Sequence, residues 1–244
     1  MCYPCKSMTL VQHWCPHSAC DKEPGMRHRW QWYLGLITWG LWGIWAGSAW
    51  GQSKILVDFS TERETVPKGW ELSVNTGEAQ LQLVQDSGKQ ALQMRSDQAS
   101  FALQKKVRIG LQELPYLVWQ WKVTELPKGG DFRRSRTDDQ AAQLIVAFSS
   151  SQFLAYIWDS TAPKGTLASA PAPLFKKIFA MVMQSGTPGL GTWITERRNV
   201  LEDYKQAFGE EPEALEGIRI QINSQHTQSR AESYWHSITL TAKP

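Results

Sequence analysis

Cysteine and histidine are scarce in this sequence, and both are concentrated near its beginning. All four cysteines lie within the first twenty residues, and only His226 and His236 of the five histidines come after residue 28. From residue 52 onward the chain therefore has no disulfide, no thiol nucleophile and no three-histidine metal site. It also lacks a glycine-rich phosphate loop and a Gly-x-Ser-x-Gly nucleophile elbow. The sequence leaves open whether the protein is an enzyme, and it favours a non-catalytic role.

A strong excess of one charge is also missing. The 244 residues carry a formal net charge of +3, to which residues 1–51 contribute four basic and two acidic side chains. Residues 52–244 alone therefore carry a formal net charge of +1. A nearly neutral domain offers no electrostatic case for binding nucleic acid.

The segment from Met26 to Gly51 has the pattern of a secretory signal peptide. Arg27 and Arg29 give it a positive start, residues 32–46 are apolar and uncharged, and small residues follow. This order of regions predicts export to the periplasm or secretion, with cleavage after Ala49 or two residues later. The alternative is an uncleaved signal anchor, because the apolar run approaches the length that spans a bilayer. That anchor would then be the protein's only attachment to a membrane.

Residues 1–25 lie upstream of this signal. We expect translation to begin at Met26, so that residues 1–25 reflect a start assigned too early and would be disordered if present. The competing interpretation is a small zinc site, because the segment holds cysteines and histidines at short spacings. Its ligands would come from Cys2, Cys5, His13, Cys15, His17 and Cys20.

Short alternating strands dominate the remainder of the chain. In residues 116–123 the apolar positions include Leu117, Trp119 and Trp121, and their period of two predicts that both tryptophans face the core from one side of a sheet. Residues 144–148 and 153–158 are apolar at every position, which predicts central strands covered on both faces. Further strands are expected at 54–59, 70–74, 79–85, 91–95, 100–107, 174–183, 193–200, 217–222 and 234–240.

These strands are separated by turn signals, a pattern typical of an all-β fold. We predict that residues 52–244 form a single antiparallel β-sandwich, jelly-roll-like, behind a disordered or cleaved N-terminal leader. One short helix is expected from Val200 to Phe208, where Asn199 can cap its start and Gly209 can end it. Residues 163–173 are rich in proline, alanine, glycine and serine and are expected to form a long loop.

A charged loop at residues 125–140 is the candidate binding loop, because binding residues often lie on loops between core strands. The alternative is a solvated loop whose arginines and aspartates pair with each other. The candidate residues are Asp131, Arg133, Arg134, Arg136, Asp138 and Asp139.

A second charged group, Glu196, Arg197, Arg198 and Asp203, is the candidate ion-pair cluster. We predict that Asp138 or Asp139 pairs with Arg197 or Arg198 at one edge of the sandwich. Two other uses of these carboxylates remain open. They can form the acid/base pair of a glycan hydrolase, or they can hold calcium. No cofactor is otherwise expected. The carboxylates concerned are Asp131, Asp138, Asp139, Glu196 and Asp203.

Several strings together resemble the exported bacterial proteins grouped as domain of unknown function 3047. They are Trp119-Gln-Trp-Lys-Val123, Leu126-Pro-x-Gly-Gly-Asp131, Asp138-Asp-Gln-Ala-Ala142, Trp193-x-x-Glu-Arg-Arg-Asn-Val200, Asp203-Tyr204 and Phe208-Gly-Glu-Glu-Pro212. The likeness runs from about residue 59 to residue 240 and implies an exported single-domain β protein with no assigned reaction. Where the family is expected to have Asp-x-Asp-x-Thr, this chain has Asn223-Ser-Gln-His-Thr227. Any cation that this turn holds in other members would lack both carboxylates here, because amides occupy positions 223 and 225.

The expected function is therefore an exported, non-catalytic module that binds a glycan or another component of the cell envelope. Two alternatives remain open: a carboxylate-dependent enzyme acting on polysaccharide, and a structural envelope protein with a protein partner. The expectation of glycan binding follows from the predicted fold, because the loops and faces of β-sandwiches commonly host such sites.

Overall fold

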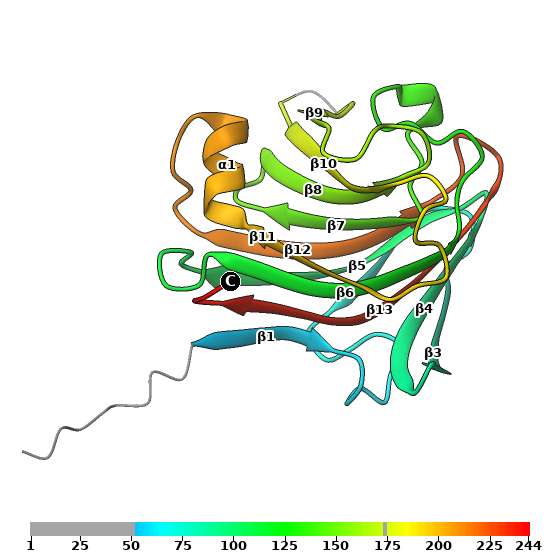
Figure 1. The fold of residues 1–244 in the computed structure, drawn as a ribbon, viewed down its shortest axis with the longest axis horizontal. Coiled ribbons are helices and arrows are strands. Elements are labelled where there is room, and N and C mark those ends of the chain that lie inside the picture. The colour runs from blue at the N-terminus through cyan, green and yellow to red at the C-terminus, as the bar shows by residue number, and fades with distance from the viewer. Residues whose placement is uncertain (1–51, 173–174) are drawn as a thin grey trace, which may run out of the picture. The chain divides into compact units, whose positions relative to one another are not determined.

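The computed structural model describes residues 52–172 and 175–244, which form two facing β-sheets and one α-helix (Figure 1). The predictions on residues 1–51, namely the early start, the signal peptide and the zinc alternative, concern residues outside this part. No helix within the described residues is long and apolar enough to cross a membrane.

Sheet A contains six antiparallel strands in the order β11-β6-β13-β4-β3, with β1 added alongside β13. The last strand, β13, lies at the centre of this sheet, because it pairs with β6 on one side and with β4 and β1 on the other. The strands are β1 (Ser53–Asp58), β3 (Gln80–Asp86), β4 (Lys89–Asp97), β6 (Tyr116–Glu125), β11 (Ile194–Asn199) and β13 (Arg230–Thr241).

Sheet B contains seven strands in the order β2-β5-β12-β7-β8-β10-β9. All neighbours are antiparallel except β8 and β10, which run parallel, so the predicted antiparallel sandwich has one mixed sheet. The strands are β2 (Glu71–Thr76), β5 (Ser100–Ile109), β7 (Ala142–Ala147), β8 (Gln152–Asp159), β9 (Leu167–Ser169), β10 (Lys177–Ser185) and β12 (Leu215–Asn223). The loop predicted at 163–173 thus contains a short edge strand, β9.

The core lies between the two sheets and is rich in tryptophan. Trp119 and Trp121 of β6 are both fully buried, which confirms that they share the inner face of their strand. The Trp121 ring lies 5.5 Å from that of Trp235 on the same sheet and 6.1 Å from that of Trp158 on the opposite sheet, measured between centroids. Aromatic side chains of this size supply much of the apolar area that a sandwich removes from water.

The helix α1 (Val200–Phe208) has the predicted boundaries for the predicted reasons. The Asn199 side chain accepts a hydrogen bond from the Glu202 backbone N–H, and Gly209 ends the helix with φ of 77°. That angle is readily adopted by glycine at a helix end. The buried face of α1 includes Tyr204, whose ring packs 4.4 Å from that of Phe148. The helix is therefore fixed at one end of the sandwich.

Candidate functional site

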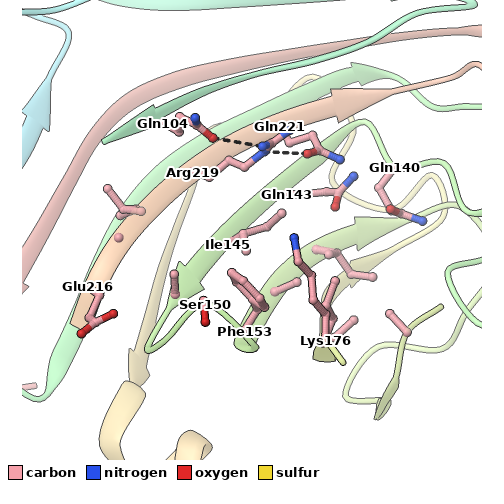
Figure 2. Close-up of a pocket in the computed structure, with 18 of the residues that line it drawn as sticks. Gln104, Gln140, Gln143, Ile145, Ser150, Phe153, Lys176, Glu216, Arg219 and Gln221 are labelled. Atoms are coloured by element: carbon pink, nitrogen blue, oxygen red, sulfur yellow. Dashed lines mark hydrogen bonds between the residues drawn. The ribbon is translucent and has the colours of Figure 1, made fainter. Parts of the chain in front are cut away.

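The outer face of sheet B carries a groove of about 640 Å³ (Figure 2). Its floor is set by the register of five strands, which places outward-facing side chains in rows across the sheet. One such row runs from Gln104 on β5 through Arg219 on β12, Ile145 on β7 and Ala155 on β8 to Ala180 on β10. Side chains opposite each other in neighbouring strands are in contact distance, so the groove is a continuous surface built from distant parts of the sequence.

One half of the groove is lined by amides. Figure 2 shows Gln104 and Gln221 on either side of Arg219, with Gln143 and Gln140 further along. The Gln143 amide nitrogen donates to Asn223 Oδ1 at 2.6 Å, and that of Gln140 donates to Asp138 Oδ1 at 3.1 Å. These bonds orient the amides, and an amide offers both donors and acceptors to a polar ligand.

The other half of the groove is apolar. A second hydrophobic cluster lies on the outer face of sheet B, separate from the core between the sheets, and Phe153 and Ile145 are half-buried in the groove beside it. The buried members of the cluster are Phe132, Ala155, Ile157, Ala162, Ala180 and Val182. The prediction that β7 and β8 are covered on both faces is therefore right at Ile157 and wrong at Ile145 and Phe153. There the outward apolar side chains form a groove floor.

The charged loop borders this groove, but few of its charged side chains line it. Asp131 binds Arg133 through two hydrogen bonds of 2.8 Å, and its carboxylate lies 3.7 Å from Arg134. The arginines of this loop, Arg136 included, are exposed and do not line the groove. Of the six predicted binding-loop residues only Asp138 lines it. The alternative interpretation, charges pairing within the loop, holds for three of these six residues, Asp131, Arg133 and Arg134.

Asp138 lies at the end of the groove with an altered acidity. Burial raises its pKa from 3.8 to about 6, although the hydrogen bond from Gln140 and the nearby His226 oppose that rise. The neighbouring Asp139 and Asp159 carboxylates raise the pKa further. A carboxyl group with a pKa near 6 exists in both protonation states close to neutral pH, which is the property of a general acid or base.

Asp139, in contrast, is fully buried and structural. Its Oδ2 accepts from the backbone N–H of Thr227 at 2.6 Å and from the hydroxyl of that residue at 2.8 Å. The Asn223 side chain donates to the carbonyl oxygen of Asp138 at 2.7 Å, which a carboxylate at this position could not do. Hydrogen bonds thus fasten the turn at residues 223–227 to the loop. The described residues contain no group of three or more His, Cys, Asp or Glu side chains that could hold a metal ion.

The predicted pairing of Asp138 or Asp139 with Arg197 or Arg198 is wrong. Neither aspartate forms a salt bridge with either arginine within the described residues. Arg197 is exposed, and Arg198 binds Asp203 through two hydrogen bonds, one of them 2.9 Å long. The reason is that β11 lies at the edge of sheet A, whereas the loop adjoins sheet B.

Two of the other candidate carboxylates also lie away from the groove. Glu196 faces inward opposite Trp119, where burial raises its pKa and Gln184 donates to it at 2.6 Å. Asp203 accepts a hydrogen bond of 2.8 Å from the buried Tyr156 hydroxyl. The predicted ion-pair cluster therefore contains one ion pair, Arg198 with Asp203. Through Arg198 on β11 and Tyr156 on β8, Asp203 fastens α1 to both sheets.

Asp159, which was not among the predicted residues, holds the backbone segments at one end of the groove in place. Its carboxylate accepts from the backbone N–H groups of Phe132 at 2.9 Å, Thr161 at 2.9 Å and Ala162 at 2.7 Å. Burial nevertheless raises its pKa. These bonds hold Phe132 over the apolar half of the groove, so the loop closes that end.

Sequence reasoning also missed Arg219 and Gln221, although a signal was present. Ile218, Ile220 and Ile222 alternate along β12 and face the core. The residues between them must therefore point outward together. A charged residue at the centre of such a run is the feature that could have indicated a site.

A model of one protein family matches residues 68–239 of this sequence, and the family is described as a protein of unknown function, DUF3047. The chain belongs to the DUF3047 family. This membership confirms the resemblance inferred from the motifs, and it brings no assigned reaction. No curated protein matches the sequence.

Several solved structures are similar to the DUF3047 chain at low identity. The xyloglucanase domain of NopAA from Sinorhizobium fredii has a TM-score of 0.47 at 10% identity, with 72% of this chain and 95% of that chain covered. Endoglucanase Cel12A from Rhodothermus marinus has a TM-score of 0.44 at 12% identity, with 78% and 99% covered. The family 11 carbohydrate-binding module from Clostridium thermocellum has a TM-score of 0.40 at 11% identity, with 79% and 96% covered.

Proposed function

We propose that this DUF3047 protein is an exported periplasmic or secreted module that binds a glycan chain in the groove of sheet B. The observation that carries the proposal is the division of the groove into an amide-lined half and an apolar half (Figure 2). A sugar ring has hydroxyl groups around its rim and C–H groups on its faces. Glutamine amides complement the hydroxyls, and Phe153 offers an apolar surface to a ring face.

The size and shape of the groove fit an oligosaccharide. Its volume of about 640 Å³ lies within the roughly 300–1,000 Å³ typical of small-molecule sites. The floor lies on strands, and the hydrogen bonds of Asp138, Asp139 and Asp159 hold the bordering loop. A site that is formed before binding loses less conformational entropy when a ligand enters.

The proposal is tested by titration calorimetry with neutral and acidic oligosaccharides of four to six units. Phe153→Ala and Gln221→Ala should each weaken the binding of the best ligand about tenfold, the effect of losing roughly one ring contact or hydrogen bond. Gln85→Ala is the matched control, because Gln85 is an exposed strand glutamine on the other sheet. Equal affinity in all four proteins, or no binding to any oligosaccharide, would contradict a glycan site in this groove.

Asp138 favours a second candidate function, a polysaccharide-active enzyme. Its pKa of about 6 suits a general acid, and Glu71 and Glu216 line the same groove. Release of reducing ends from a bound glycan, abolished in Asp138→Asn, would establish catalysis. Binding without release would leave the non-catalytic module.

A further inference from the structure

Arg219 occupies the floor of the groove, with an amide on each side. Its Nε donates to Gln221 Oε1 at 2.8 Å, and its Nη1 donates to Gln104 Oε1 at 3.1 Å (Figure 2). A guanidinium has five N–H donors, so these two bonds leave three donors without an acceptor among the described residues. Both acceptors are neutral, and they fix the plane of the guanidinium without compensating its charge.

No carboxylate within the described residues forms a salt bridge with Arg219. Burial lowers its pKa, and no favourable charge opposes that effect. An arginine still stays protonated at neutral pH. The floor of the groove therefore holds a cation that is partly removed from water, a costly arrangement unless an anion is supplied.

The other charges around the groove do not supply that anion. Glu216 binds Arg108 at 3.0 Å at one rim, and Asp138 is bonded to Gln140 at the far end. Glu71 is exposed on β2, where the strand order places Gln104 between it and Arg219. Three lysines also line the groove, and Figure 2 shows Lys176 extending over it. They are Lys105, Lys106 and Lys176.

We infer that Arg219 recognises the carboxylate of an acidic sugar unit, so that the ligand is a uronate-containing polysaccharide. This inference rests on the proposed glycan-binding function and names its ligand class. An arginine holds a carboxylate with two parallel N–H···O bonds, and the three unused donors of Arg219 suffice for that geometry. Gln104 and Gln221, already bonded to Arg219, would present their amide N–H groups to the hydroxyls of the same sugar unit.

The test compares two ligands with the same sugar backbone: hexagalacturonate, which carries carboxylates, and its fully methyl-esterified form, which is neutral. An alginate hexamer is measured in parallel as a second uronate, and a sulfated dextran oligomer as an anion without carboxylate. The wild-type protein should bind at least one uronate about tenfold or more tightly than the neutral ester. This preference should shrink as salt is added, because exposed charges are screened.

The variants assign the preference to one side chain. Arg219→Gln should abolish the preference for the acid over the ester, whereas Arg219→Lys should keep part of it. Arg197→Gln is the control, since Arg197 is exposed on the edge strand β11 of the other sheet. Thermal melting of each variant verifies that its fold is intact.

The outcomes separate this inference from the proposed function. In one outcome, the protein binds neutral oligosaccharides through Phe153 and Gln221 and binds acidic ones no more tightly. That result would overturn the inference and leave the glycan site standing. Equal binding of the sulfated oligomer would overturn the assignment to a carboxylate. Absence of binding to every oligosaccharide would overturn both.

Discussion

Replacing Asp203 by alanine should destabilise the fold by about 2–4 kcal/mol. The substitution removes the only acceptor that the described residues provide for the Tyr156 hydroxyl, which lies on a side chain that is 1% exposed. Leaving a buried hydroxyl without a partner costs about 1–3 kcal/mol. The same substitution removes the carboxylate that binds Arg198.

Losing the ion pair with Arg198 lowers the free energy of unfolding by less than losing a fully buried pair would. Breaking a buried ion pair costs about 3–5 kcal/mol, whereas an exposed pair is worth below about 1 kcal/mol. The Arg198 side chain is 33% exposed, against 4% for Asp203. Its guanidinium can therefore regain water, and about 1 kcal/mol is the appropriate increment. Together with the unpaired hydroxyl, this gives the stated range.

Urea unfolding at neutral pH measures the effect, with Glu202→Ala as the matched control. Glu202 lies in the same first turn of α1 but is exposed, so its loss should cost only the helix-dipole interaction, about 0.3–1 kcal/mol. Tyr156→Phe should cost about 1 kcal/mol, because one hydrogen bond is lost while Arg198 keeps its partner. If Asp203→Ala cost no more than Glu202→Ala, the account of this buried network would be refuted.

Three further predictions concern the core, the groove end and the loop. Trp119→Ala and Trp121→Ala should each cost about 3–5 kcal/mol in urea unfolding, because both rings are fully buried; near-wild-type midpoints would contradict that burial. Asp138→Asn should become progressively more stable than wild type as pH rises from about 4 to 6. The pKa of Asp138 is about 6 in the folded protein against an ordinary value of 3.8, so the wild-type protein loses stability as this carboxyl deprotonates in that window. A constant difference between the two urea midpoints across this pH range would exclude the effect. Gly130→Ala should lower the melting temperature, because its Cβ would collide with the backbone carbonyl oxygen of Asp139. Gly110→Ala, with open space around it, is the control and should be neutral.

Local features of this fold were predictable because local interactions decide them. The limits of α1 follow from the Asn199 cap and the Gly209 end, and both act within one helical turn. The strand containing Trp119 and Trp121 follows from alternation, since one face must be buried. The family resemblance was recognisable for a related reason, because short strings such as residues 126–131 specify tight local geometry.

Pairings between distant segments were not predictable. Nothing in the sequence near Arg198 distinguishes Asp203, five residues away, from the aspartates at 138 and 139 as its partner. The choice depends on which sheet each strand joins, and opposite charges fit many registers. The parallel pairing of β8 with β10 is likewise invisible in periodicity, because parallel and antiparallel strands share the period of two.

The groove was missed because an outward apolar residue and an inward one look alike in a sequence. Ile145 and Phe153 made β7 and β8 resemble fully covered strands, yet they line the site. The charged loop was chosen as the candidate site because of its many charges, although three of its six candidate residues pair with each other. Arg219 is distinguished by the lack of a carboxylate partner among the described residues, a property that needs three-dimensional neighbours.

The central position of β12 and β13 has a consequence for the order in which this protein can fold. A nascent chain synthesised as far as residue 214 would hold β2 with β5 and β7 with β8, but not the strand that joins these groups into sheet B. In the other sheet β6 and β4 would likewise lack β13 between them. Both sheets are completed only by residues 215–241, so cooperative folding must follow synthesis of β12 and β13. Pairing across such long sequence separations is slow, and until it occurs the unpaired edges of both half-sheets stay open to aggregation.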